Sequence, residues 1–106
     1  GRKKDVINVA GLKVYAPEVE DAIYKHAAVA EVAVIGVAGG LKGEQVRAVV
    51  VPKEGESVTA EDITAHCRTV LADYKVPRQV DIRTAPLPRS RTGKIAKEQL
   101  REPPPP

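Results

Sequence analysis

The sequence predicts a small α+β domain in which a short hairpin is followed by a three-stranded sheet packed with helices. The chain has 106 residues, enough for one domain with a single small core. Two apolar runs of strand length, 32–37 and 46–51, are rich in valine, whose β-branched side chain suits strands. Two stretches with apolar residues at helical spacing, 17–26 and 60–72, precede and follow these runs.

The first part of the chain is expected to form a hairpin and then a helix. Residues 6–9 have the length of a short strand, and Gly11 favours a turn because glycine tolerates positive φ. Residues 13–15 can pair back as the second arm. Pro17 then stands at the first helical position and starts the helix over 17–26.

The two apolar runs are expected to pair antiparallel, because a short glycine loop joins them. Thr59 and Asp62 form a weak capping box that starts the second helix. The apolar face of that helix is expected to consist of Ile63, Cys67, Val70 and Leu71. A third strand is expected near 80–83, an irregular loop over 86–93 and a short last helix over 95–101.

Positive charge is concentrated at the two ends of the sequence. The formal net charge is +3, with +3 in residues 1–13, +4 in residues 86–101 and −4 in the remainder. This arrangement suits an anionic ligand held near the ends. Solvated surface charge is an equally good explanation of the same pattern.

Several common catalytic and metal sites are excluded by the residues present. One cysteine, Cys67, allows neither an internal disulfide nor a cysteine-built metal site. His26 and His66 lack metal-ligand spacing, and His66 cannot pair with Cys67 as base and nucleophile because adjacent helical side chains diverge. The glycine loop 39–43 lacks the P-loop pattern. No apolar run is long enough to span a bilayer.

The segment 86–95 is the strongest candidate for chemistry. Pro86 and Pro88 stiffen its start, and Gly93 allows the chain to turn close to a ligand. Lys94 follows as a compact charge on a flexible stem, which suits contact with phosphate. From composition alone, a basic surface loop remains the simpler interpretation.

Two long motifs resemble those of a known family. Residues 1–20 are similar to the motif that opens the C-terminal domain of the adenylate-forming enzymes, and 87–95 to the closing motif that carries their catalytic lysine. The segments 42–44 and 74–77 also fit. The family holds acyl-CoA synthetases, luciferases and the adenylation domains of peptide synthetases. The resemblance covers 1–101, which we therefore expect to be the C-terminal, mobile lid domain of an acyl-CoA synthetase.

The resemblance implies a two-step, AMP-forming acid–thiol ligase in the cytoplasm. A carboxylate attacks the α-phosphate of ATP to give an acyl-adenylate and pyrophosphate, and the thiol of coenzyme A then displaces AMP. An N-terminal adenylation domain of the same polypeptide would bind most of the ATP, the Mg²⁺ and the acid. The chain alone is expected to be inactive, and its proline tail, 102–106, to be disordered.

The resemblance also assigns residue roles. Lys94 would be catalytic, bridging the carboxylate and the α-phosphate during adenylation. Lys4 falls at the hinge about which the domain rotates, and Arg2 and Lys13 would contact the nucleotide. In the thioester-forming pose, Gly11 would face the channel for the pantetheine arm of coenzyme A.

The role of Arg68 and the identity of the group that accepts the acyl chain each have an alternative. Arg68 would contact a phosphate of coenzyme A, although a solvated helix arginine explains it as well. The closing motif reads Thr-Gly-Lys-Ile where peptide-synthetase domains tend to have Asn-Gly-Lys-Val, which favours a free acyl-CoA ligase over an enzyme that loads a carrier protein. A basic module that binds nucleic acid is a third possibility, but the sequence lacks stacking aromatics beyond three tyrosines. No nucleic-acid partner is expected.

Overall fold

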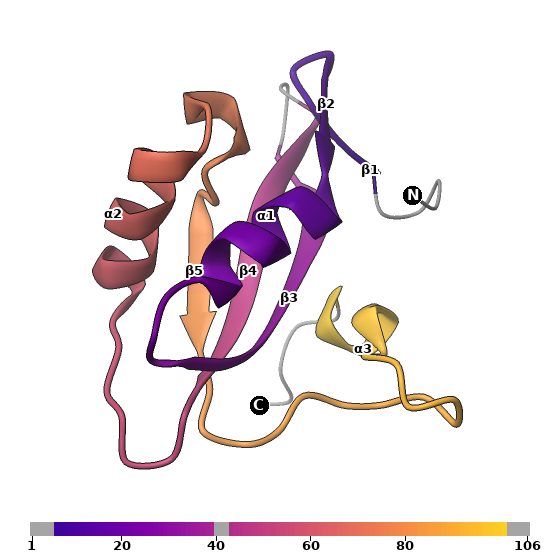
Figure 1. Ribbon diagram of the computed structural model, residues 1–106. Coiled ribbons are helices and arrows are strands. Elements are labelled where there is room, and N and C mark those ends of the chain that lie inside the picture. The colour runs from indigo at the N-terminus through magenta and orange to yellow at the C-terminus, as the bar shows by residue number, and fades with distance from the viewer. Residues whose placement is uncertain (1–5, 40–42, 102–106) are drawn as a thin grey trace.

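The computed structural model describes residues 6–39 and 43–101 (Figure 1). Its elements in chain order are β1 (Val6–Val9), β2 (Leu12–Tyr15), α1 (Ala16–Tyr24), β3 (Val29–Ala38), β4 (Glu44–Pro52), α2 (Ala60–Val70), the 3₁₀ helix η3 (Asp73–Lys75), β5 (Gln79–Ile82) and α3 (Lys97–Arg101). The predicted order is confirmed, and η3 is an addition to it. None of the helices in the described ranges is long and apolar enough to cross a membrane.

The β-structure consists of a hairpin and a three-stranded sheet. β1 and β2 pair antiparallel and are joined by the two residues between Val9 and Leu12. In the larger sheet β4 is central, antiparallel to β3 and parallel to β5. The parallel pair needs a crossover connection, which α2 provides. The α+β prediction and the antiparallel pairing of the two apolar runs are therefore confirmed.

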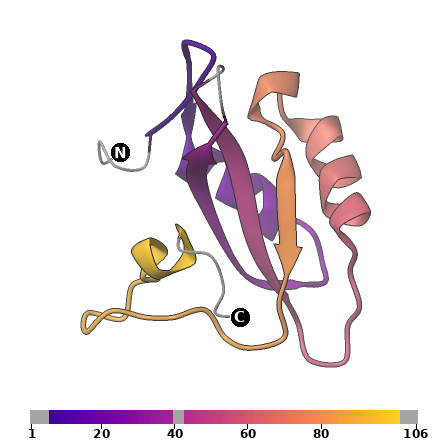
Figure 2. The ribbon, with the colours of Figure 1, turned by 180° about the vertical axis from the view of Figure 1, so that it is seen from behind.

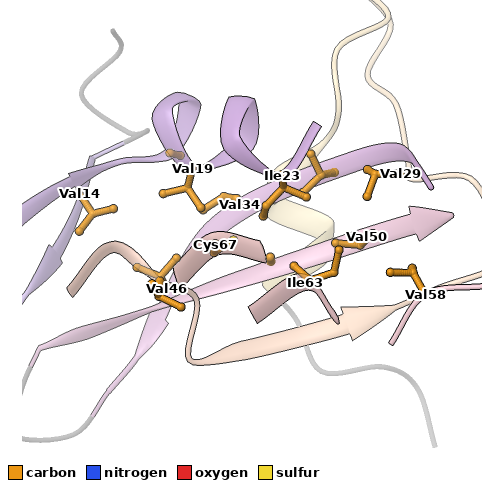
Figure 3. Close-up of a cluster of buried hydrophobic side chains, with 14 of the residues drawn as sticks. Val14, Val19, Ile23, Val29, Val34, Val46, Val50, Val58, Ile63 and Cys67 are labelled. Atoms are coloured by element: carbon orange, nitrogen blue, oxygen red, sulfur yellow. The ribbon is translucent and has the colours of Figure 1, made fainter. Parts of the chain in front are cut away.

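Both faces of the larger sheet are buried, which explains why β3 and β4 read as almost unbroken apolar runs. Side chains alternate between the two faces along each strand. The first face lies under α1 and α2 (Figure 3) and contributes Val32, Val34, Val46, Ala48 and Val50. The second face contributes Ala33, Ile35, Val49 and Val51. The C-terminal segment, which is the part of the chain after β5 (83–101), covers this second face with Leu87 and Leu100. This face is turned toward the viewer in Figure 2.

The two longer helices begin close to where the sequence predicts, whereas α3 begins at Lys97, two residues later than expected. Pro17 lies in the first turn of α1, and Glu18 stands near the positive end of the helix dipole. At the start of α2, the Thr59 hydroxyl accepts a hydrogen bond from the Asp62 amide, and the Asp62 carboxylate accepts one from the Thr59 amide, both at 3.0 Å. The predicted capping box is therefore present in full.

The helix ends differ from the prediction by a few residues. α1 ends at Tyr24, two residues earlier than expected. α2 ends at Val70, because Leu71 already has an extended backbone. The assignment of Val70 to the buried face is wrong: its side chain is 51% exposed, whereas Cys67 is fully buried.

The outer edge of β3 is covered by side chains of α1. The Tyr24 hydroxyl accepts a hydrogen bond from the Val32 amide at 3.4 Å, and a carboxylate oxygen of Glu20 accepts one from the Val34 amide at 2.9 Å. An edge strand otherwise offers unpaired amides to other chains. These two contacts fix α1 beside the outer edge of β3.

Candidate functional site

Lys94 follows a tight turn that the C-terminal segment forms after β5. The turn is closed by hydrogen bonds from the Ser90 amide to the Lys94 carbonyl at 2.7 Å and from the Gly93 amide to the Ser90 carbonyl at 3.0 Å. Arg89 and Ile95 pair as an isolated antiparallel bridge just outside it. Gly93 has a φ of +85°, a conformation that favours glycine and explains its place in the turn.

An open pocket of about 760 Å³ lies beside this turn. Its walls come from α1, β3 and the C-terminal segment, with Glu20, Tyr24 and Lys94 among the lining residues. The Lys94 side chain is exposed, and no carboxylate in the described part of the chain forms an ion pair with it. An ammonium group in this state can contact an anion brought to the domain from outside.

A second lysine of the same pocket is held in the domain. The Lys97 ammonium lies 2.9 Å from a carboxylate oxygen of Glu20, and both side chains are mostly buried. The same oxygen accepts the hydrogen bond from the Val34 amide. Glu20 therefore ties α3 to α1 and to the edge of β3, which supports the wall of the pocket.

Gly11 and Lys13 lie on the β1–β2 hairpin. The turn is formed by Ala10 and Gly11, with φ values of +52° and +85°, and the Asn8 side-chain oxygen accepts a hydrogen bond from the Gly11 amide at 3.1 Å. Positive φ at both central residues matches the tight hairpin turn that suits twisted strands. No heavy atom of the described chain lies within 4 Å of the position that a Gly11 β-carbon would occupy, so the turn is open to a partner.

Arg68 lines a smaller cleft, of about 250 Å³, between α2 and the start of β5. Thr64, Glu61 and Arg78 line the same cleft. The Arg78 guanidinium also forms a highly exposed ion pair, with its nitrogen 3.6 Å from a carboxylate oxygen of Asp73. The cleft thus combines two guanidinium groups, which can bind phosphate, with one carboxylate that opposes this, while the Thr64 hydroxyl donates to the Ala60 carbonyl at 2.9 Å.

The structure does not bring these predicted residues together. The Lys94 turn and the hairpin turn lie at opposite ends of the domain in both views, and Arg68 is on α2, along the side of the sheet (Figures 1 and 2). Neither Gly11, Lys13 nor Arg68 lines the pocket beside Lys94. Arg2 and Lys4 lie outside the described residues.

The histidines and the cysteine have structural contacts. The rings of His26 and His66 meet edge to face with centroids 5.4 Å apart, and His66 Nε2 lies 2.8 Å from the Ala22 carbonyl oxygen. Burial raises the pKa of the Cys67 thiol to about 11, so the thiol is neutral at physiological pH and a poor nucleophile. Within the described residues, no three or more metal-ligating side chains gather into a metal site.

A family model of the AMP-binding enzyme C-terminal domain matches residues 18–94, well over half of the chain. The chain belongs to this family. The resemblance to the C-terminal domain of the adenylate-forming enzymes is therefore confirmed.

The relatives of this AMP-binding C-terminal domain are much longer proteins. A long-chain-fatty-acid–CoA ligase of Escherichia coli O157:H7 is 46% identical over 101 residues, which are 95% of this chain and 18% of the relative. A fatty acyl CoA synthetase of Mycobacterium tuberculosis superposes with a TM-score of 0.85 at 43% identity, over 94% of this chain and 20% of that one. The amide bond synthetase McbA of Marinactinospora thermotolerans gives 0.87 at 35% identity, over 95% and 20%.

The contacts of two carboxylates were not predicted from the sequence, in which Glu31 is not singled out and Glu44 appears only within the segment 42–44. Glu31 contacts the segment that carries Lys94, and Glu44 accepts a hydrogen bond from the Asn8 amide of the hairpin at 3.0 Å. Each lies in a strand next to an apolar run, Glu31 before 32–37 and Glu44 before 46–51. The signal that could have drawn attention to both is an acidic residue directly beside a buried apolar run. A carboxylate near the core costs free energy unless it has a partner, so such a residue suggests a specific contact.

Proposed function

We propose that this domain is the mobile part of an ATP-dependent carboxylic acid–CoA ligase. The reaction is acyl-adenylate formation from ATP and the acid, followed by thioester formation with coenzyme A. The observation that carries the proposal is the separation of the turn over 90–94 from the hairpin turn, at opposite ends of a domain of this family (Figures 1 and 2). One rigid domain can present only one of these ends to an active site at a time, so two half-reactions would use two orientations.

Lys94 serves the first half-reaction in this proposal. Its ammonium bridges the substrate carboxylate and the α-phosphate and offsets the negative charge that develops on their oxygens. The exposed side chain, on a turn closed by backbone hydrogen bonds, supports this role. Lys13 on β2 and Arg2 assist in holding the nucleotide, and Lys4 is the hinge.

Gly11 serves the second half-reaction. The open space around its α-carbon leaves room for the pantetheine arm of coenzyme A. Arg68, with Arg78 and Thr64 beside it, contacts a phosphate of coenzyme A, and the cleft of about 250 Å³ is large enough for such a group. ATP, Mg²⁺ and the acyl chain bind mainly to the N-terminal adenylation domain of the same polypeptide.

The substrate class follows from the relatives. Long-chain-fatty-acid–CoA ligases are prominent among them, so a fatty acid is the proposed acid and coenzyme A the proposed acceptor. A ligase of this kind acts in the cytoplasm, where ATP and coenzyme A are available. Transfer to a carrier protein is the alternative for the second step.

Lys94→Ala in the ligase that contains this domain tests the proposal. Losing a preorganised cation should slow adenylation by about 10²–10³-fold, equivalent to about 3–4 kcal/mol. Thioester formation from a supplied acyl-adenylate should be unchanged, since the Lys94 turn then faces away from the active site. ATP–pyrophosphate exchange measures the first step, and acyl-CoA release measures the second. Lys53→Ala, at another exposed lysine, is the control. Equal losses in both steps would contradict the proposal.

A further inference from the structure

A carboxylate on β3 is joined to the Lys94 turn through an arginine. One oxygen of Glu31 accepts a hydrogen bond from the Arg89 guanidinium at 2.6 Å, and the other lies 3.4 Å from the Leu87 amide. The second terminal nitrogen of Arg89 donates to the Gly93 carbonyl at 3.1 Å. The residue after Gly93 is Lys94. A continuous path of hydrogen bonds therefore runs from the sheet to the backbone beside the lysine.

The path begins on a rigid support. Glu31 belongs to β3, which pairs with the central strand β4 along nearly its whole length. The Glu31 side chain is only 19% exposed. Leu87 is buried against the second face of the sheet. The turn beyond Leu87 is exposed from Arg89 to Lys94. The Glu31–Arg89 pair is thus the side-chain contact that carries the order of the sheet out to this exposed turn.

We infer that Glu31 is a positioning residue for Lys94 and acts through Arg89. The inference rests on the proposed role of Lys94 in adenylation. Partly exposed ion pairs add little to stability, so the pair, with Arg89 48% and Glu31 19% exposed, is not needed to keep the domain folded. Its contribution is geometric, since a misplacement of about 1 Å at a reacting group can cost two orders of magnitude in rate.

The sign of the effect separates positioning from simple electrostatics. Adenylation builds negative charge near Lys94. Removing the negative charge of Glu31 would therefore assist the reaction if Glu31 acted only through its electric field. Positioning predicts the opposite result, a slower reaction. Glu31→Gln is the sharpest variant because an amide has one acceptor oxygen in place of two and can keep only one of its two partners.

The main experiment compares four forms of the ligase: the unaltered enzyme, Glu31→Gln, Lys94→Ala and the double variant. Glu31→Gln should slow adenylation at least about tenfold and leave thioester formation from a supplied acyl-adenylate unchanged. In the Lys94→Ala background, Glu31→Gln should cause no further loss. Glu18→Gln is the matched control. Glu18 also forms an ion pair, with an oxygen 2.9 Å from the Lys75 ammonium, but this pair does not involve the Lys94 turn.

The outcomes distinguish this inference from the proposed function. If Lys94→Ala slows adenylation while Glu31→Gln does not, the inference fails and the proposed function stands. If the two losses multiply in the double variant, Glu31 acts independently of Lys94 and the inference is wrong. If Lys94→Ala has no effect on adenylation, the proposed function fails and takes the inference with it. If Glu31→Gln slows both half-reactions equally, Glu31 has only a structural role and the inference is wrong.

A second measurement needs no activity and uses the 106-residue chain itself. Hydrogen exchange of the Ser90 and Gly93 amides reports whether the turn stays closed. Glu31→Gln should accelerate both amides at least about fivefold with little change at the amides of β4. Arg89→Lys should do the same, because lysine keeps the charge but lacks the fork that reaches two acceptors. Unchanged exchange in both variants would overturn the inference.

Discussion

The Glu44 carboxylate fills the space beside Gly36 that a β-carbon would need. A β-carbon added to Gly36 would lie 2.9 Å from Glu44 Cδ and 3.2 Å from Ile7 Cγ2. From that position Glu44 accepts the hydrogen bond of the Asn8 amide at 3.0 Å. The absence of a side chain on β3 therefore allows a carboxylate on β4 to hold the hairpin.

Gly36→Ala should destabilise the domain and loosen the hairpin. The methyl group would displace the end of the flexible Glu44 side chain from Asn8, with a cost of about 0.5–1.5 kcal/mol for the lost hydrogen bond. Urea unfolding measures the loss, and hydrogen exchange at Asn8 measures the loosening. In a Glu44→Ala background the same change should cost less, because of the closest contacts only that with Ile7 Cγ2 at 3.2 Å remains. A cost that is equal in both backgrounds would show that Glu44 is not its cause.

Gly11→Leu should impair thioester formation more than stability. Gly11 and Gly55 both have positive φ, +85° and +81°, and neither has a heavy atom within 4 Å of its β-carbon position. A leucine at either site should therefore cost a similar strain, about 1–2 kcal/mol. In the ligase, only Gly11→Leu should slow the second half-reaction while adenylation continues. Equal kinetics of the two variants would contradict the proposed channel.

Ala10→Asn should stabilise the hairpin. Ala10 is the one non-glycine residue with positive φ in the described ranges, and asparagine tolerates that conformation better than alanine. We expect a gain of about 0.5–1 kcal/mol, seen as a higher thermal midpoint. Ala27→Asn, at an exposed alanine without positive φ, should give no such gain. A lower midpoint for Ala10→Asn would show that the turn is not strained.

The stability of the domain should fall between about pH 9 and pH 11 because of Cys67. Burial raises the pKa of its thiol from 9.0 to about 11, so the folded state keeps a proton that the unfolded state has lost in this range. The buried thiol contributes its full share to the free energy of unfolding below pH 9. By pH 11 about 2–3 kcal/mol of this contribution is lost. Urea unfolding across this range should show a smaller pH dependence in Cys67→Ala. An identical dependence in both proteins would contradict the shift.

The order and type of the elements were predictable because each depends on a local pattern. The valine-rich runs alternate between two buried faces, and the capping box at Thr59 uses residues three apart. The exposed position of Val70 was not predictable, because α2 stops there although the apolar spacing continues to Leu71. A helix end set by the path of the following chain leaves no mark in the periodicity.

The candidate site was predictable only in part. Lys94 and Gly11 were found through motifs, and their roles remain predictions. Glu31 and Arg89 are 58 residues apart, and no spacing rule links residues at that distance. Their meeting depends on how the C-terminal segment folds back over the sheet, which a single sequence does not reveal.

The double-sided sheet has a consequence for synthesis. The strands that carry Ala33, Ile35, Val49 and Val51 leave the ribosome well before Leu100, which is needed to cover them. Until then the nascent chain exposes a valine-rich surface of the kind that chaperones bind and that promotes aggregation. A copy interrupted before Leu100 would lack part of its own core and fall to proteolysis. The segment that carries Lys94 is therefore also needed to complete the core of the domain.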